Sequence, residues 1–168
     1  MSADPISRDR EKGWVVEDGK RLVTFRLKTF RSYENRLISL VGGRIGEMLL
    51  YQMGNEIGRA AFEYSREVIR SEADLGPVLD SVLSARGWGR CGHFQKQDGT
   101  GKGTYVVRLT GTPSSDSRIA TKPSCHIERG LVAGYLEAYS GKKVQSHSES
   151  SCVVTGGQFC TFEIILNP

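Results

Sequence analysis

Four potential metal donors lie within 36 residues of one another, and their spacing constrains the fold more than any other feature of the chain. The donors are Cys125, Glu149, Cys152 and Cys160. A structural zinc ion takes about four ligands at the corners of a tetrahedron, mostly thiolates or imidazoles with an occasional carboxylate. The first donor opens a predicted helix, and the other three fall along a predicted hairpin. The spacing therefore favours a closed zinc site that pins the helix to the hairpin.

Local signals indicate where this helix begins and ends. Apolar residues recur at helical spacing from 127 to 139, with Pro123 before the segment and Gly141 after it. Proline near the first helical position and glycine past the last are the residues expected at these places. We place Cys125 in the first turn, where the helix dipole favours a thiolate.

A hairpin is predicted after the helix. Its strands cover residues 143–148 and 159–166, with Gly156 and Gly157 between them. We expect Glu149 and Cys152 to bracket a turn, and Cys160 to lie near the start of the second strand. One helix start and two strand ends can then converge on a single point.

The clustered cysteines also allow a disulfide, inert thiols or a different set of metal ligands. Two of the three could form a disulfide, and any of them could be an inert buried thiol. His126 and His147 enlarge the possible ligand set, because His147 is two residues before Glu149 and would share its strand face. Residues 1–13 are charged and lack the apolar stretch of a secretory signal, so we expect a cytoplasmic protein.

A longer motif surrounds the four donors. It consists of a Cys that opens a helix with Gly and Ala-Gly steps, a Gly-X-X-Val strand, and then Glu-X-X-Cys and Gly-X-X-X-Cys-X-Phe. The matching segments are Cys125–Tyr135, Gly141–Val144, Glu149–Cys152 and Gly156–Phe162. This pattern resembles the C-terminal signature of the 4-vinyl reductase domain family. The match is good over residues 123–165, holds in outline over 40–112 and is weak over the first thirty residues.

The resemblance implies a fold, a metal and a range of functions. Family members include the sensor domains of aromatic-responsive transcription activators and proteins linked to bacteriochlorophyll synthesis. Their fold is similar to that of the small subunits of the TRAPP vesicle-tethering complex. In the aromatic sensors, three cysteines and one glutamate hold a zinc ion, which implies Cys125, Glu149, Cys152 and Cys160 in this chain.

The remaining sequence predicts an α+β domain. The order of elements indicates an antiparallel four-stranded sheet with helices packed on one face, and a zinc-stapled C-terminal helix and hairpin. We expect this domain at 31–168, preceded by a hairpin or extension at 1–30. The other predicted elements are a hairpin at 14–25, one or two helices over 33–70, a helix at 75–83, and strands at 88–95 and 104–110.

The long helical segment over 33–70 contains four glycines at multiples of four residues: Gly42, Gly46, Gly54 and Gly58. Glycine inside a helix costs about 1 kcal/mol relative to alanine, so we expect another element to approach closely. Tight packing inside the monomer is favoured over a subunit interface. The segment is nevertheless apolar on several sides, at Leu40, Leu50 and Phe62, which predicts a homodimer that uses it.

Composition and motifs argue against several function classes. Apolar residues make up 38% and charged residues 25%, with a net charge of +4, which is typical of a soluble globular domain. No apolar run approaches the ~20 residues of a membrane span. Basic residues form no cluster interleaved with aromatics, so we expect no direct nucleic-acid binding. The glycine-rich segment 97–103 lacks the Ser or Thr and the helix of a phosphate loop.

We expect a binder and not an enzyme. A zinc site with four protein ligands has no open position for activating water, and the chain lacks a nicotinamide or flavin fingerprint. The favoured function is a small-molecule sensor or carrier for a hydrophobic or aromatic ligand. The alternative is a TRAPP-like scaffold that acts through dimerisation and protein partners. For each aromatic candidate taken singly, a place in the core is favoured over ligand binding. The candidate ligand-binding residues are Tyr51, Phe62, Trp88, His93, Phe94, Tyr105, Tyr135 and Tyr139.

Overall fold

The computed structural model describes residues 6–17, 20–97, 103–116 and 124–168. The chain divides into two compact units, residues 1–33 and 34–168. The second unit contains all four of the predicted metal donors.

The N-terminal unit contains a small antiparallel sheet. Strands β1 (Ile6–Asp9), β2 (Trp14–Glu17) and β3 (Lys20–Leu22) pair in the order β1-β2-β3. The pairing of β2 with β3 confirms a hairpin in this segment, whose predicted turn residues 18 and 19 lie outside the described residues. The second strand was predicted over 22–25 and was misplaced, because β3 ends at Leu22. Strand β1 was not predicted, because its sequence Ile-Ser-Arg-Asp has neither alternation nor a β-branched run.

The helical segment predicted over 33–70 begins six residues earlier, at Leu27, and forms two α-helices that end at Ser65. Helix α1 (Leu27–Val41) and helix α2 (Gly43–Ser65) are separated at Gly42, whose φ of 85° lies in the left-handed region that glycine adopts without strain. Short 3₁₀ turns follow at Arg66–Val68 and Glu72–Asp74. They lead into α3 (Leu75–Ala85), which confirms the helix predicted at 75–83.

The second unit is built on one four-stranded antiparallel sheet. Its strands β4 (Arg90–Gln97), β5 (Gly103–Thr110), β6 (Val144–Ser151) and β7 (Cys160–Leu166) pair in the order β4-β5-β7-β6. Helix α4 (His126–Ser140) lies in sequence between β5 and β6, after a 3₁₀ turn at Pro113–Asp116. The predicted α+β fold with a four-stranded antiparallel sheet is confirmed. One detail was wrong: β6 continues to Ser151, so Glu149 lies inside a strand and not at a turn.

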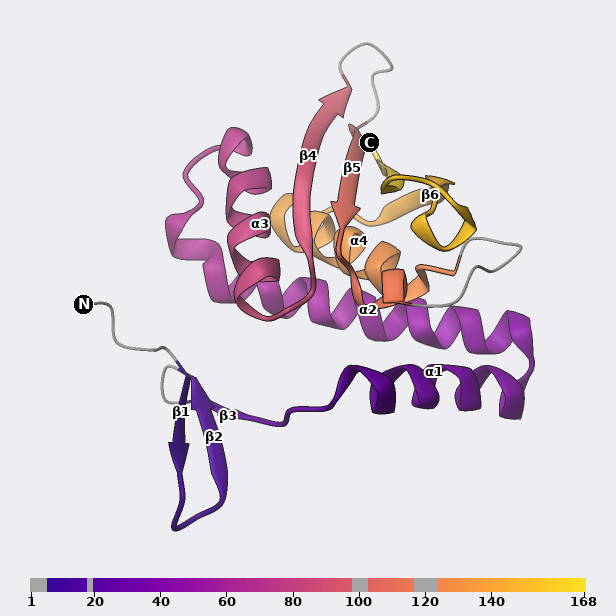
Figure 1. Ribbon diagram of the computed structural model, residues 1–168. Helices are drawn as coiled ribbons and strands as arrows, with labels where there is room; N and C mark the ends of the chain where they lie inside the picture. The colour runs from indigo at the N-terminus through magenta and orange to yellow at the C-terminus, as the bar shows by residue number, and fades with distance from the viewer. Residues whose placement is uncertain (1–5, 18–19, 98–102, 117–123) are drawn as a thin grey trace. The chain divides into compact units, whose positions relative to one another are not determined.

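One face of this sheet carries the core. Tyr105, Val107 and Leu109 alternate along β5, and their partners on β7 are Ile164, Phe162 and Cys160, all of them buried. Helices α3 and α4 add buried apolar residues to the same cluster. In Figure 1, α4 passes behind strands β4 and β5. The other face of β5 carries the exposed Arg108, so the alternation of the sequence follows the burial of the sheet.

Helices α2 and α4 cross at very close range. A Cβ atom at Gly54 or Gly58 would overlap the carbonyl oxygen of Ile127 or Leu131 on α4. A Cβ at Gly134 of α4 would likewise overlap the carbonyl oxygen of Asn55. Gly54 and Gly58 therefore serve packing inside the monomer, as predicted, and Gly46 lies against Ile38 of α1. The prediction was wrong for Gly42, where a Cβ atom would meet no other described group within 4 Å. Leu50, expected on an outer side of the helix, is only 2% exposed and belongs to the interior.

Among the described helices, none combines the length and the apolar character that crossing a bilayer requires.

Candidate metal centre and adjacent pocket

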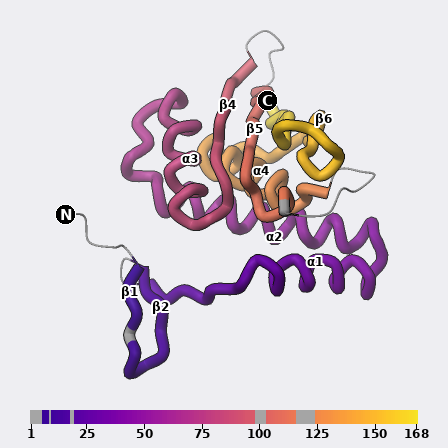
Figure 2. The backbone as a smooth tube through the Cα atoms, in the orientation of Figure 1, coloured from indigo at the N-terminus to yellow at the C-terminus, as the bar shows by residue number. Residues whose placement is uncertain are grey.

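The fold brings the four predicted metal donors to one point. Cys125 is the N-terminal capping residue of α4, Glu149 lies in β6, Cys152 follows β6, and Cys160 begins β7. One ligand atom from each of these residues lies within 4.8 Å of all the others. Figure 2 shows the C-terminal strands, in yellow, returning to the region where α4 begins. The convergence of a helix start with the hairpin is as the spacing predicted.

Two glycines let the chain return from Cys152 to Cys160. A 3₁₀ turn at Val153–Thr155 ends at Gly156, whose φ is 94°. The N–H of Gly157 then donates to the carbonyl oxygen of Cys152 at 2.8 Å. A Cβ at Gly157 would lie 2.6 Å from the Ser151 hydroxyl oxygen, so a side chain there would disturb the turn. The paired glycines thus allow the turn that brings Cys152 and Cys160 to the same cluster.

All four cysteines of the chain are free thiols. The Sγ atom of Cys125 lies 3.5 Å from that of Cys152 and 3.2 Å from that of Cys160. Both separations are far longer than a disulfide bond of about 2.05 Å. The structure therefore contains three reduced thiols around one point, and Cys91 lies outside the cluster.

Glu149 supplies the strongest indication that a cation belongs in this cluster. Both of its carboxylate oxygens are buried and neither accepts a hydrogen bond from the described residues. A buried carboxylate without donors carries a large desolvation cost unless a cation compensates it. Three thiols and one carboxylate also form a donor set that suits a tetrahedral zinc ion. The residues present therefore fit a bound metal.

The thiols share their protons unequally. The hydrogen bond between Cys160 and Cys125, together with burial, raises the pKa of Cys125. The same hydrogen bond lowers the pKa of Cys160, which also accepts the N–H of Val153 at 3.5 Å. Burial, followed by the neighbouring Glu149, raises the pKa of Cys152. The Cys125 and Cys160 thiols therefore titrate as a pair that shares one hydrogen bond.

His147, the alternative ligand considered from sequence, faces a different group. Its ring stacks on Tyr51 of α2, with ring centroids 4.3 Å apart and an interplanar angle of 27°. Burial, followed by the Arg129 guanidinium, lowers its pKa. His147 is not part of the metal-ligand cluster, whose carboxylate is Glu149.

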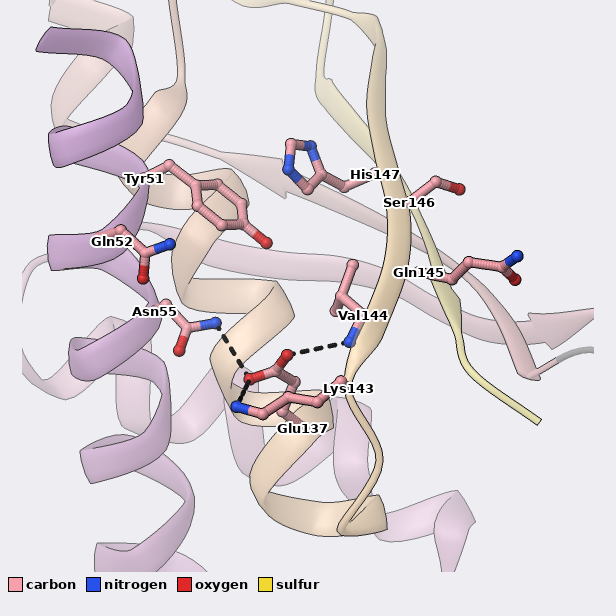
Figure 3. Close-up of a pocket in the computed structure, with 9 residues that line it drawn as sticks. All are labelled: Tyr51, Gln52, Asn55, Glu137, Lys143, Val144, Gln145, Ser146 and His147. Carbon is pink, nitrogen blue, oxygen red and sulfur yellow. Dashed lines mark hydrogen bonds and ion pairs between the residues drawn. The ribbon is translucent and has the colours of Figure 1, made fainter. Parts of the chain in front are cut away.

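A pocket of about 570 Å³ lies between α2 and β6. Figure 3 shows Tyr51, Gln52 and Asn55 along one wall, the first residues of β6 along the other, and Glu137 of α4 at the base. The lining is completed by Lys143, Val144, Gln145, Ser146 and His147. Of these residues, only Tyr51 was predicted from sequence as a ligand-binding residue. The others are mostly polar, and only their place in the fold distinguishes them from surface residues.

Glu137 is held at the base of the pocket by four donors. Its Oε1 atom accepts the backbone N–H of Val144 at 2.9 Å. Its Oε2 atom accepts hydrogen bonds from Asn55 at 3.5 Å, from Lys143 at 3.4 Å and from the guanidinium of Arg59. Burial by itself would raise the pKa of Glu137, but these groups outweigh it and the pKa is lowered. Glu137 is therefore an ionised carboxylate that the protein itself satisfies.

The other predicted ligand-binding residues lie elsewhere. Phe62 packs edge to face with Tyr135 and Tyr139, and Phe94 packs at a tilt on Tyr105. These five residues and Trp88 belong to, or pack against, the core cluster. His93 pairs with Arg108 in the β4–β5 ladder, two residues from the half-buried Cys91. The structure thus brings only Tyr51 to the pocket, and a ligand-binding role for the rest stays a prediction.

The chain resembles known proteins more in structure than in sequence. No family model matches it. An uncharacterized protein of Methanocaldococcus jannaschii is 44% identical over 45 residues, which is 27% of this chain and 27% of that protein. The chain therefore matches about a quarter of the length of this relative.

Three solved structures share the fold. The phenol-responsive sensory domain of the transcription activator PoxR, determined with phenol, has a TM-score of 0.75 at 18% identity and covers 96% of this chain and 85% of its own. A vinyl-4-reductase family protein from Methanocaldococcus jannaschii has a TM-score of 0.60 at 18% identity, covering 88% and 85%. A trafficking protein particle complex subunit 3 from Naegleria fowleri, covalently bound to palmitic acid, has a TM-score of 0.63 at 14% identity, covering 84% and 93%. The relationships in fold predicted from the C-terminal motif are confirmed.

Proposed function

We propose that this protein is a zinc-stabilised domain that binds a small hydrophobic or aromatic molecule, as a sensor or a carrier. The observation that carries the proposal is the buried cluster of three thiols around the unpaired carboxylate of Glu149, in a fold shared with a phenol-responsive sensory domain. Thiolate donors favour zinc over harder cations such as magnesium or calcium.

The zinc ion would have a structural role. Cys125, Glu149, Cys152 and Cys160 would supply all four ligands, so no position remains open for water or substrate. The ion would join the start of α4 to the β6–β7 hairpin, and its charge would compensate Glu149 and the ionised thiols. We therefore propose a non-enzymatic, cytoplasmic binding protein.

Small-molecule binding is tested on the zinc-loaded chain with phenol, a neutral aromatic probe. A ligand that binds only the folded state raises the melting temperature, and at 100 times its dissociation constant it adds about 2.7 kcal/mol of stability. We expect a saturable rise in melting temperature with phenol and none with cyclohexanol, a non-aromatic control of similar size. No response to phenol, together with no co-purified small molecule in native mass spectrometry, would contradict the proposal.

A second candidate function, a scaffold that acts as a homodimer, is favoured by an exposed apolar face. Ile45 and Met48 near the start of α2 are 52% and 55% exposed, and Leu40 at the end of α1 is 67% exposed. Such a cluster of exposed apolar residues is typical of an interaction surface. A second copy of the chain is the simplest occupant, since two-fold dimers are the commonest assembly.

Light scattering distinguishes the two candidates. If the apolar face forms a dimer, Met48→Glu gives a monomer, while Glu56→Lys on an exposed part of the same helix leaves the dimer intact. Leu50 is unsuitable for this test because it is buried inside the protomer. A wild-type chain that is monomeric at tens of micromolar, where a dimer of micromolar affinity is mostly formed, would rule out the scaffold.

A further inference from the structure

The pocket between α2 and β6 exposes hydrogen-bond donors that the protein leaves unused. The hydroxyl of Tyr51 points into the space between the two walls, and the Gln52 side chain lies closer to the α2 backbone (Figure 3). Neither side chain forms a hydrogen bond with the described residues. Burial, followed by the charge of Glu137, raises the pKa of Tyr51 to about 12, so the hydroxyl keeps its proton and can donate. The Tyr51 hydroxyl is therefore available to donate a hydrogen bond to a ligand in this part of the pocket.

The charged side chains at the pocket also favour an acceptor, specifically an anionic one. Among the described residues that line the pocket, Glu137 is the one acidic side chain, and it contacts two cations, Lys143 and Arg59. One positive charge therefore exceeds what Glu137 neutralises. The Lys143 side chain is 72% exposed, and its Nζ atom lies at 3.4 Å from Glu137, beyond the 2.7–2.9 Å typical of a strong charged hydrogen bond. This ammonium group is able to turn toward a second anion.

The walls of the pocket limit the size and the chemistry of the rest of a ligand. The stacked rings of Tyr51 and His147 add aromatic surface to the lining, and Val144 adds an apolar patch. The volume of about 570 Å³ lies within the range of about 300–1,000 Å³ that small-molecule sites occupy. A ligand with one ring or a short chain fits such a space.

We infer that this pocket binds a small organic carboxylate, with Lys143 and Tyr51 donating to the carboxylate oxygens and the Tyr51–His147 stack flanking the body of the ligand. The inference rests on the proposed small-molecule function and goes beyond it in naming the site and the anionic class of ligand. The site borders the apolar interior through Tyr51 and Val144, while the other predicted aromatic residues belong to that interior or pack against it.

The test uses the zinc-loaded full chain and two probes, benzoate and its neutral analogue benzyl alcohol. At 18.5 kDa the protein suits two-dimensional ¹H–¹⁵N NMR, which locates binding as well as measuring it. We expect benzoate to shift the backbone amides of Gln52, Asn55 and Val144 in a saturable manner, and benzyl alcohol to bind at least about tenfold more weakly. This difference corresponds to the loss of a charge-assisted hydrogen bond.

Matched variants assign the effect to residues. Lys143→Gln removes one charge and should weaken benzoate about tenfold or more, whereas Lys142→Gln removes the same charge next to the pocket and should change the affinity less than twofold. Tyr51→Phe keeps the ring stack and deletes only the hydroxyl, and we expect it to weaken benzoate severalfold. Unchanged melting temperatures would show that these variants remain folded.

The outcomes separate the two proposals. Benzoate that binds equally to wild type and to the Lys143→Gln variant, or that shifts amides outside the pocket, would overturn the inferred site. If phenol binds and benzoate does not, the carboxylate inference fails while the proposed function stands. If neither probe binds and the protein carries no co-purified small molecule, both fail.

Discussion

Glu149 and Glu137 both have buried carboxylates, but only Glu137 is hydrogen-bonded by the protein. Glu137, at the base of the pocket, is held by the N–H of Val144 and by the side chains of Asn55, Arg59 and Lys143. Glu149 receives no hydrogen bond from the described residues, although both of its oxygens are buried. It lies among thiols, which are themselves sources of negative charge. The protein itself satisfies one carboxylate, and the other lies in a cluster that could hold a metal ion.

This difference shows how a buried charge can be assigned a role. A carboxylate that the protein satisfies stabilises the fold without help, whereas an unsatisfied one marks a place where a partner binds. The effect of removing each carboxylate should therefore depend differently on metal. Substitutions at and around the two sites test this contrast, and the largest effect is expected at the thiols.

Loss of a metal-ligating thiol should have the largest effect. We expect Cys160→Ser to abolish metal retention and to lower the free energy of unfolding by about 4 kcal/mol or more, because binding of a structural zinc contributes directly to folding. Chemical denaturation with metal analysis measures both quantities. Cys91→Ser is the control: it changes a thiol outside the cluster and should keep the metal. Equal effects of the two variants would contradict a metal site at the cluster.

Neutralising each carboxylate should then separate the two sites. Glu137→Gln is expected to cost about 2 kcal/mol with or without metal, because it weakens hydrogen bonds from charged donors that remain in place. Glu149→Gln should destabilise only the metal-loaded protein. In the stripped protein the same substitution should be neutral or stabilising, since it removes a buried charge without donors.

The measurement is thermal unfolding of both variants before and after chelation. His147→Ala provides a further control, and we expect it to retain metal much better than Glu149→Ala does. If His147→Ala lost metal more readily, the assignment of Glu149 as the fourth ligand would be wrong. If Glu149→Gln destabilised the stripped protein as much as the loaded one, the contrast between the carboxylates would disappear.

Acidic pH should lower the stability of the fold, because Glu137 then becomes protonated. Its pKa is lowered in the folded state, so ionised Glu137 stabilises the fold above its ordinary pKa of 4.5. That contribution is lost as the pH falls below 4.5 and through the lower pKa of the folded state. We therefore expect the melting temperature of Glu137→Gln to depend less on pH between about 5 and 3 than that of wild type.

Part of the acid dependence should remain in this variant. Asp80 has a lowered pKa as well, because it accepts hydrogen bonds from Arg90 and from the N–H of Cys91. Parallel curves for wild type and Glu137→Gln would show that Glu137 does not titrate as inferred.

Removal of an exposed partner of Glu137 should have the smallest effect. The Lys143 side chain is 72% exposed, and such ion pairs contribute about 0–1 kcal/mol. We expect Lys143→Gln to change the free energy of unfolding by less than about 0.5 kcal/mol. A loss comparable to that of Glu137→Gln would mean that Lys143 is essential to the network and not free to bind a ligand.

The sequence predicted the metal cluster better than the pocket, for a physical reason. Cysteines and a glutamate at fixed spacing carry their chemistry in their identity, and glycines at 156 and 157 indicate where the chain turns back. The pocket consists of ordinary polar residues of α2 and β6, brought together by the close α2–α4 crossing. Nothing in the spacing of Asn55 and Glu137, which are 82 residues apart, predicts their contact.

The fold was predictable where periodicity was strong, and less so where special conformations or polar strands occur. Helix α3, helix α4 and the strand pair β4–β5 follow their apolar patterns closely. The extension of β6 through Glu149 was missed because Ser146–Ser151 is wholly polar, and cross-strand pairing with β7 decides its conformation. Apolar residues of α2 that are exposed in the structure were expected in the core or at an interface. The sequence could not show which side of this helix would remain uncovered by the rest of the fold.

The most direct test of the metal site is native mass spectrometry of the protein purified without chelator and under reducing conditions. We predict one zinc ion per chain, retained by Glu137→Gln and lost or strongly depleted in Glu149→Gln. A wild-type chain at its metal-free mass would contradict this prediction. So would a chain lighter by two hydrogen atoms, because two of the clustered cysteines would then have been oxidised to a disulfide.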